Sequence, residues 1–146
     1  MDLDKFALRF GKILINLKSM EFLARAILTN KFGSVTFPKR IDCYEIGETL
    51  EKCYLTDAIN LRNVLEKFKS EFDFEMDIDR ICLLRNAIAH GRLSTFMKDG
   101  ILHMFNTKPF NNTEVEMEWN AILDESWFDK ENGYIREVID RMAKLN

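Results

Sequence analysis

Apolar residues recur at alternating intervals of four and three positions over the first thirty residues of the chain. This spacing places side chains on one face of an α-helix, so the sequence predicts a helix from about Asp2 to Asn30. Gly33, Pro38 and scattered polar residues then interrupt the pattern until Gly47, which indicates a loop. The apolar stripe consists of Phe6, Phe10, Ile13, Leu17, Met20, Ala24 and Ile27.

Two further helical segments follow the loop. The first runs from about Glu48 to Glu71 and carries two apolar stripes, which indicate contacts with two neighbours. The second, from Ile78 to Ile88, is apolar nearly all round, as expected of a helix at the centre of a domain. Four acids between Asp73 and Asp79 precede it. We predict that they cap the helix start rather than bind calcium, because no calcium-loop glycine or terminal glutamate follows at the required spacing.

Beyond Gly91 the spacing changes from helical to alternating. We therefore predict a hairpin formed by residues 93–97 and 101–105, with a tight turn at Lys98 to Ile101. Residues 114–119 alternate strictly, which predicts a third strand with an acidic solvent face and an apolar buried face. A loop over residues 106–112, which contains a proline, joins the second strand to the third.

A final helix is predicted to begin between Asp124 and Asn132. Its buried side chains should be Ile135, Val138, Ile139, Met142 and Leu145. The whole pattern predicts a single domain over residues 1–146. Its fold class is mainly α, a helical bundle with a small antiparallel β meander inserted between the third and last helices.

Composition narrows the class of protein. With 146 residues, of which 47% are hydrophobic, the chain can bury a core without disulfides, and its three cysteines predict a reduced, intracellular protein. No apolar run reaches the ~20 residues of a membrane span, and no leader pattern opens the sequence, so we expect a cytoplasmic protein with no membrane association. A net charge of −3 and a pI near 5.5 exclude a broad nucleic-acid-binding field. A nucleic-acid substrate would depend on a local basic region, formed by Arg80, Arg85, His90, Arg92 and Lys98.

That region contains the residues with the clearest chemistry, in the run 85–92, which reads RNAIAHGR. A helix turns by about 100° per residue, so Asn86 and His90 lie on nearly one face, whereas Arg85 and His90 are separated by about 140°. Arg85 must therefore reach around the helix or serve a group brought by another surface. Gly91 is expected to end the helix in the left-handed conformation and to leave His90 at the accessible opening of a site. Two such helix ends facing each other across a two-fold axis would assemble two histidines and two arginines around one phosphate.

This run resembles the signature of the HEPN (higher eukaryotes and prokaryotes nucleotide-binding) domains. In that family an arginine, usually followed by a polar residue, precedes a histidine by four to six positions on a helix of an all-α bundle. Arg85, Asn86 and His90 fit this pattern. The resemblance implies metal-independent RNA cleavage at a site shared by two protomers, as in toxin–antitoxin and phage-defence ribonucleases. It implies an RNA substrate, a homodimer, no cofactor and no metal ion, with an antitoxin or another protein as a candidate partner.

The resemblance also implies a role for each residue. His90 would take the proton of a ribose 2′-hydroxyl or give one to the leaving oxygen, because a histidine side chain titrates near neutral pH. Arg85 would hold the phosphate and neutralise the charge that builds in the transition state. Asn86 would orient His90 or the phosphate. Arg92 and Lys98 would extend the electrostatic track along the RNA strand.

Other interpretations of the same residues stay open. A histidine at a helix end can serve as a cap near the negative end of the helix dipole, and Arg85 with Asn86 can pair with Asp57 on the neighbouring helix. The second hypothesis is a catalytically silent HEPN-like module that dimerises, or binds a nucleotide or a partner, through this helix end. Some HEPN toxins also carry a tyrosine two residues after the histidine, which their antitoxin modifies. Arg92 stands there, so the resemblance does not extend to that control.

Two classes of site are not predicted. His103 has no second histidine, cysteine pair or acid at ligand spacing, so the sequence offers no metal site. No glycine-rich phosphate loop precedes a helix, which argues against a nucleotide-dependent enzyme of the P-loop or dinucleotide-binding type.

Overall fold

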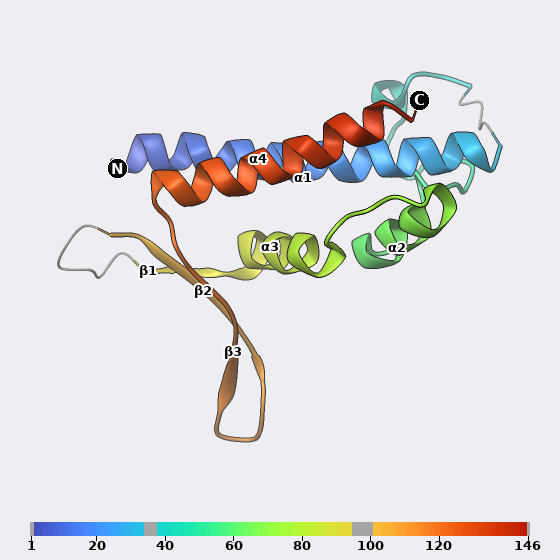
Figure 1. Ribbon diagram of the computed structural model, residues 1–146. Coiled ribbons are helices and arrows are strands. Elements are labelled where there is room, and N and C mark those ends of the chain that lie inside the picture. The colour runs from blue at the N-terminus through green and yellow to red at the C-terminus, as the bar shows by residue number, and fades with distance from the viewer. Residues whose placement is uncertain (1, 34–37, 95–100, 146) are drawn as a thin grey trace.

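The computed structural model describes residues 2–33, 38–94 and 101–145. Within them the chain is mainly α-helical and carries a three-stranded antiparallel sheet, which confirms the predicted class (Figure 1). The sheet lies between the third and last α-helices in the chain, as predicted. The elements are α1 (Leu3–Lys31), a short 3-10 helix (Ile41–Cys43), α2 (Leu61–Phe72), α3 (Ile78–His90), β1 (Arg92–Ser94), β2 (His103–Pro109), β3 (Val115–Ile122) and α4 (Glu125–Ala143).

The core lies between the helices. α1 and α4 run alongside each other, and α2 and α3 lie below this pair (Figure 1). Every member of the predicted α1 stripe is buried except Phe10, which is half-buried and packs against the core. Full burial of a large apolar side chain stabilises a fold by roughly 1.5–3 kcal/mol. The largest fully buried side chains are Phe68, Phe128, Ile13, Met20, Leu28 and Leu65.

Short polar residues fix where the four described α-helices begin. Each helix follows an Asp or Asn whose side-chain oxygen accepts a hydrogen bond from the backbone N–H three residues later. Such a cap satisfies a donor that has no partner inside the helix. This confirms the predicted helix-capping role for Asp77. The capping pairs are Asp2 with Lys5 (2.7 Å), Asn60 with Asn63 (2.9 Å), Asp77 with Arg80 (3.0 Å) and Asp124 with Trp127 (2.8 Å).

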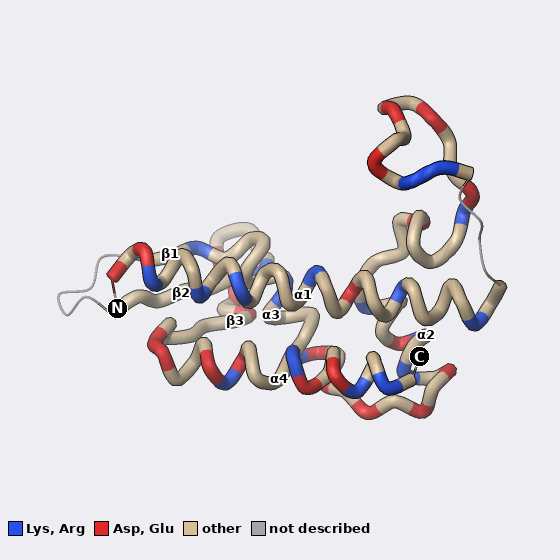
Figure 2. Tube along the Cα trace, turned by 90° about the horizontal axis from the view of Figure 1, so that it is seen from above, with Lys and Arg blue, Asp and Glu red and all other residues tan. Residues whose placement is uncertain are grey.

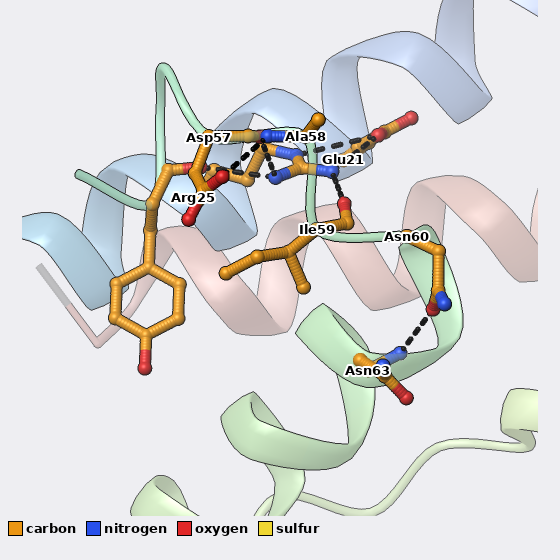
Figure 3. A network of polar contacts seen from close by, with 8 residues as sticks. Glu21, Arg25, Asp57, Ala58, Ile59, Asn60 and Asn63 are labelled. Carbon is orange, nitrogen blue, oxygen red and sulfur yellow. Dashed lines mark hydrogen bonds and ion pairs between the residues drawn. The ribbon is translucent and has the colours of Figure 1, made fainter. Parts of the chain in front are cut away.

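The predicted helix over residues 48–71 is wrong in its first half, because α2 begins only at Leu61. Residues 48–60 form an irregular segment whose carbonyl groups are bound by a side chain distant in the sequence. The Arg25 guanidinium donates to the carbonyl oxygens of Tyr54 (3.0 Å), Asp57 (3.3 Å) and Ile59 (Figure 3). Glu21 on α1 holds the same guanidinium at 3.1 Å. The hydrogen bonds from Arg25 take the place of the backbone hydrogen bonds that these carbonyl groups would accept in a helix.

The sheet has the order β1-β2-β3, with both pairs antiparallel and a bulge between Asn106 and Thr107. β2 continues to Pro109, so the predicted loop over residues 106–112 is shorter than expected. The predicted turn at Lys98 to Ile101 lies largely outside the described residues. The buried apolar face predicted for the third strand is wrong at its outer end, because Val115 and Met117 are exposed. Figure 1 shows the reason: the β2–β3 hairpin projects away from the helices, so no other described element covers that face.

α4 begins at Glu125, inside the predicted interval. Ile135, Val138 and Met142 are buried and Ile139 is half-buried, as a core-facing stripe requires. Leu145 is exposed, contrary to the prediction, because it follows the end of the helix.

Charged positions of both signs are interspersed along α4 (Figure 2). Such mixing agrees with the small net charge and gives this helix no basic face. None of the helices within residues 2–33, 38–94 and 101–145 combines the length and apolarity needed to cross a bilayer.

Candidate functional site

α3 carries all three predicted catalytic residues near or at its C-terminal end. Its buried residues are Ile81, Cys82, Leu84 and Ala87, whereas His90 is exposed and Asn86 is half-buried. The apolar residues from Ile78 to Ile88 are all buried or half-buried, as predicted, and one side of the helix end stays accessible through Asn86 and His90. The accessible side is the one that bears the amide and the imidazole, so both can meet a ligand.

The Arg85 side chain turns toward the neighbouring Asn86, which compensates for the angle between Arg85 and His90 on the helix. Its Nη1 donates to Asn86 Oδ1 at 3.2 Å, which draws the guanidinium toward the face that Asn86 shares with His90. Arg85 is half-buried and forms no salt bridge with any acid of the described residues. The alternative interpretation, in which Arg85 pairs with Asp57, does not hold for the described residues. The Asp57 carboxylate instead accepts from the Ala58 N–H (2.8 Å) and faces Lys52 (3.5 Å).

A pocket of about 250 Å³ lies between the first turn of α2 and α3, and we call it the Arg62–Arg85 pocket. Arg62 Nη1 is 2.7 Å from Asp79 Oδ1, and this hydrogen bond raises the pKa of the guanidinium. Burial raises the pKa of the Cys82 thiol, so Cys82 lines the pocket in its neutral form at neutral pH. The lining residues are Asn60, Leu61, Arg62, Cys82, Arg85 and Asn86.

Sequence reasoning missed Arg62 and Asn60. The predicted helix over residues 48–71 placed both in the middle of a helix, where they looked like ordinary solvent-facing residues. Their position at a helix start depends on the irregular segment before them. The Asn60-x-x-Asn63 spacing was the one local signal, because asparagine is a favoured N-cap residue.

The other basic residues predicted for this region lie in different parts of the molecule. Arg92 is exposed on β1, opposite Phe105 of β2 and two residues after His90. Lys98 lies outside the described residues. Arg80 is engaged elsewhere, because it donates to the buried Glu131 at 3.1 Å and lies over the Tyr134 ring at 4.0 Å. We therefore assign Arg80 a structural role.

Gly91 ends α3, but not in the way predicted. Its φ of −64° and ψ of 154° are extended rather than left-handed, and its N–H donates to the Ala87 carbonyl at 2.6 Å. A Cβ at this position would lie 2.2 Å from the Ala87 oxygen and 3.2 Å from Met104 Cγ. Glycine is therefore required because the backbone passes close to its own preceding turn.

We expect Gly91→Ala to displace the end of α3 and to destabilise the fold by about 2 kcal/mol or more, because the clash is with backbone rather than with a flexible side chain. Urea unfolding followed by circular dichroism measures this. Gly133→Ala in α4 is the matched control, since a Cβ there meets nothing within 4 Å. Equal stability of the Gly91 and Gly133 variants would contradict the close approach.

No family model, curated protein or solved structure matches this chain. Among the described residues, no three His, Cys, Asp or Glu side chains gather where they would hold a metal ion.

Proposed function

We propose that the protein is a metal-independent endoribonuclease with a HEPN-like site at the end of α3. The supporting observation is that Arg85, Asn86 and His90 all reach the accessible side of one helix end instead of being sealed in the core. Arg85 donates to Asn86, and His90 follows Asn86 by one helical turn, so we place the three groups at one substrate. A purely structural arginine would be expected to pair with a carboxylate, as Arg80 does.

The proposed reaction is an intramolecular transesterification of RNA. A base takes the proton of the ribose 2′-hydroxyl, and the oxygen attacks the adjacent phosphorus. The bond from phosphorus to the 5′ oxygen breaks, and an acid protonates that oxygen. The products are a 2′,3′-cyclic phosphate and a 5′-hydroxyl. Arg85 neutralises the charge on the phosphate oxygens as the transition state forms, and Asn86 positions Arg85 or the phosphate.

The base and the acid are two groups, while each chain supplies one histidine at this helix end. The second histidine of the sequence, His103, lies on β2. We therefore propose that two copies bring their α3 ends together across a two-fold axis, so that one His90 acts as the base and the other as the acid. Such a homodimer places the two Arg85 guanidinium groups on the same phosphate.

A ribonuclease of this kind acts in the cell as a toxin or in phage defence. Its restraint would then come from an antitoxin or another protein that covers the α3 end. Arg92, which is exposed next to His90, would contact the RNA strand beyond the cleaved bond.

The test is incubation of total cellular RNA with purified protein in excess chelator. We expect fragments with cyclic-phosphate ends from the unaltered protein and none from Arg85→Ala. Arg85→Lys should restore only a small part of the activity, because a single ammonium lacks the planar fork of a guanidinium. Intact RNA in every reaction, with folded and dimeric protein, would overturn the proposal and favour the catalytically silent module.

A further inference from the structure

The Arg62–Arg85 pocket has a charge pattern unlike that of a neighbouring pocket on α3. Its lining residues include two arginines and no carboxylate. The pocket on the side of α3 that faces β3 and α4 is lined by Asp77, Asp79 and Glu131 beside Arg80. There, Glu131 is neutralised by Arg80 and Asp77 caps α3. Two cations without a lining acid favour an anion, and guanidinium groups match the oxygens of a phosphate.

Both arginines are available to such an anion. The ion pair between Arg62 and Asp79 lies at the surface, with side-chain exposures of 45% and 78%. Exposed pairs of this kind contribute little, about 0–1 kcal/mol, so a phosphate can replace Asp79 as the partner of Arg62. Arg85 donates to a neutral amide, which leaves its other N–H groups for a ligand.

The size and position of the pocket indicate which phosphate it would hold. A volume of about 250 Å³ is small for a ligand pocket, and it suits a phosphate with part of its ribose. His90 lies four residues beyond Asn86, which is about 6 Å along the helix axis. A phosphate in the pocket and one beside His90 would therefore belong to neighbouring nucleotides, with Arg85 between them.

We infer that the Arg62–Arg85 pocket binds a phosphate of single-stranded RNA, one nucleotide away from the bond that is cleaved. This inference rests on the proposed ribonuclease function for the identity of the ligand. Arg62 then is a substrate-binding residue that acts on affinity for the strand. Asn60 and Asn86 supply neutral hydrogen-bonding groups at the edge of the same pocket.

Substitutions of Arg62 and of Asp79, the two partners of the surface ion pair, should change the affinity for a phosphate ligand in opposite directions. We expect Arg62→Gln to weaken binding of adenosine 3′,5′-bisphosphate about tenfold, because a charge-assisted hydrogen bond is lost. Asp79→Asn should strengthen it by a factor of about two to five, because the competing carboxylate is removed. Arg136→Gln, an exposed arginine of α4 that forms no ion pair with the described residues, should change nothing. The measurement is a titration followed by amide NMR, in which Arg62, Arg85 and Asn86 should shift.

A structural role for the pair predicts a different result, because both variants would then lower stability and move binding in the same direction or not at all. That result, or a titration in which the pocket amides stay unmoved, would overturn the inference. The titration needs no cleavage, so it separates the two proposals. Binding without any RNA cleavage would contradict the ribonuclease alone, whereas cleavage that Arg62→Gln leaves unchanged would contradict the pocket alone.

Cleavage of short substrates provides a second measurement. A trinucleotide carries the neighbouring phosphate and a dinucleotide does not, so the unaltered protein should have a lower KM for the trinucleotide. In Arg62→Gln this preference should disappear, because the KM for the trinucleotide should rise to that for the dinucleotide. A preference that survives the substitution would show that another residue binds the neighbouring phosphate.

Discussion

His90→Ala is expected to lower the rate of RNA cleavage by about 10²–10⁴-fold, the range that a positioned general acid or base contributes. The side chain is exposed at the last residue of α3, so its removal should leave the unfolding transition unchanged. Gel analysis of RNA fragments with time gives the rate, and circular dichroism checks the fold. The matched control is His103→Ala, which removes the other histidine of the chain and should retain full activity.

The same variant tests whether two copies share the site. When excess inactive His90→Ala protein is mixed with the unaltered protein and allowed to exchange subunits, mixed dimers form that hold one His90. Activity per unaltered chain should then fall, because each site lacks either its base or its acid. Constant activity per unaltered chain would show that one His90 suffices. A loss of activity in His103→Ala equal to that in His90→Ala would contradict the assignment of His90.

Arg25→Leu is expected to destabilise the fold by about 3 kcal/mol, the largest loss we anticipate from a single polar side chain. The guanidinium is mostly buried, with 12% exposure, and donates to the carbonyl oxygens of Tyr54, Asp57 and Ile59 (Figure 3). A hydrogen bond to a charged group contributes about 1.5–3 kcal/mol, and carbonyls left without a partner add a desolvation cost. Leucine keeps the apolar stem as far as Cδ and removes the guanidinium, so the loss mainly reports the polar contacts.

Urea unfolding measures this loss, and Arg9→Leu is the control. Arg9 also pairs with an acid across helices, but its partner Asp129 is 68% exposed, so we expect less than about 1 kcal/mol. Equal losses in the two variants would show that the bonds from Arg25 to the carbonyls stabilise the fold no more than the exposed pair of Arg9 and Asp129 does. Because the bound segment leads into Asn60 and Arg62, Arg25→Leu should also weaken bisphosphate binding while leaving His90 in place.

The limits of sequence reasoning in this chain have identifiable physical causes. α1 and α4 were predictable from a regular apolar stripe and α3 from a continuous apolar run, and each of the three follows a capping acid. The segment over residues 48–60 has apolar spacing that imitates a helix, but its carbonyls bind Arg25, which lies about thirty positions away in the sequence. No local pattern reveals such a partner. The same error concealed Arg62, because this residue reaches the pocket only from the first turn of a helix that begins at Leu61.

The candidate site shows a similar division. Arg85, Asn86 and His90 were found because polar residues on an apolar helix need a reason, and the structure leaves all three accessible. The conformation of Gly91 was predicted wrongly, since a glycine after a helix fits either a left-handed turn or a close backbone approach. In β3, alternation identified the strand but gave no information about which layer would cover Val115 and Met117.

The projecting β2–β3 hairpin divides the molecule into parts of unequal cooperativity. Beyond Phe105, β2 pairs only with β3 within the described residues, so the outer hairpin is a two-stranded ribbon with two open edges. Such a ribbon is marginally stable by itself, and here its apolar side chains gain nothing from a covering layer. It can unzip from its tip toward the bulge at Asn106, where Trp119, the partner of Asn106, packs against Trp127 of α4. Lengthening or shortening the hairpin should therefore change the free energy of unfolding of the helical core very little.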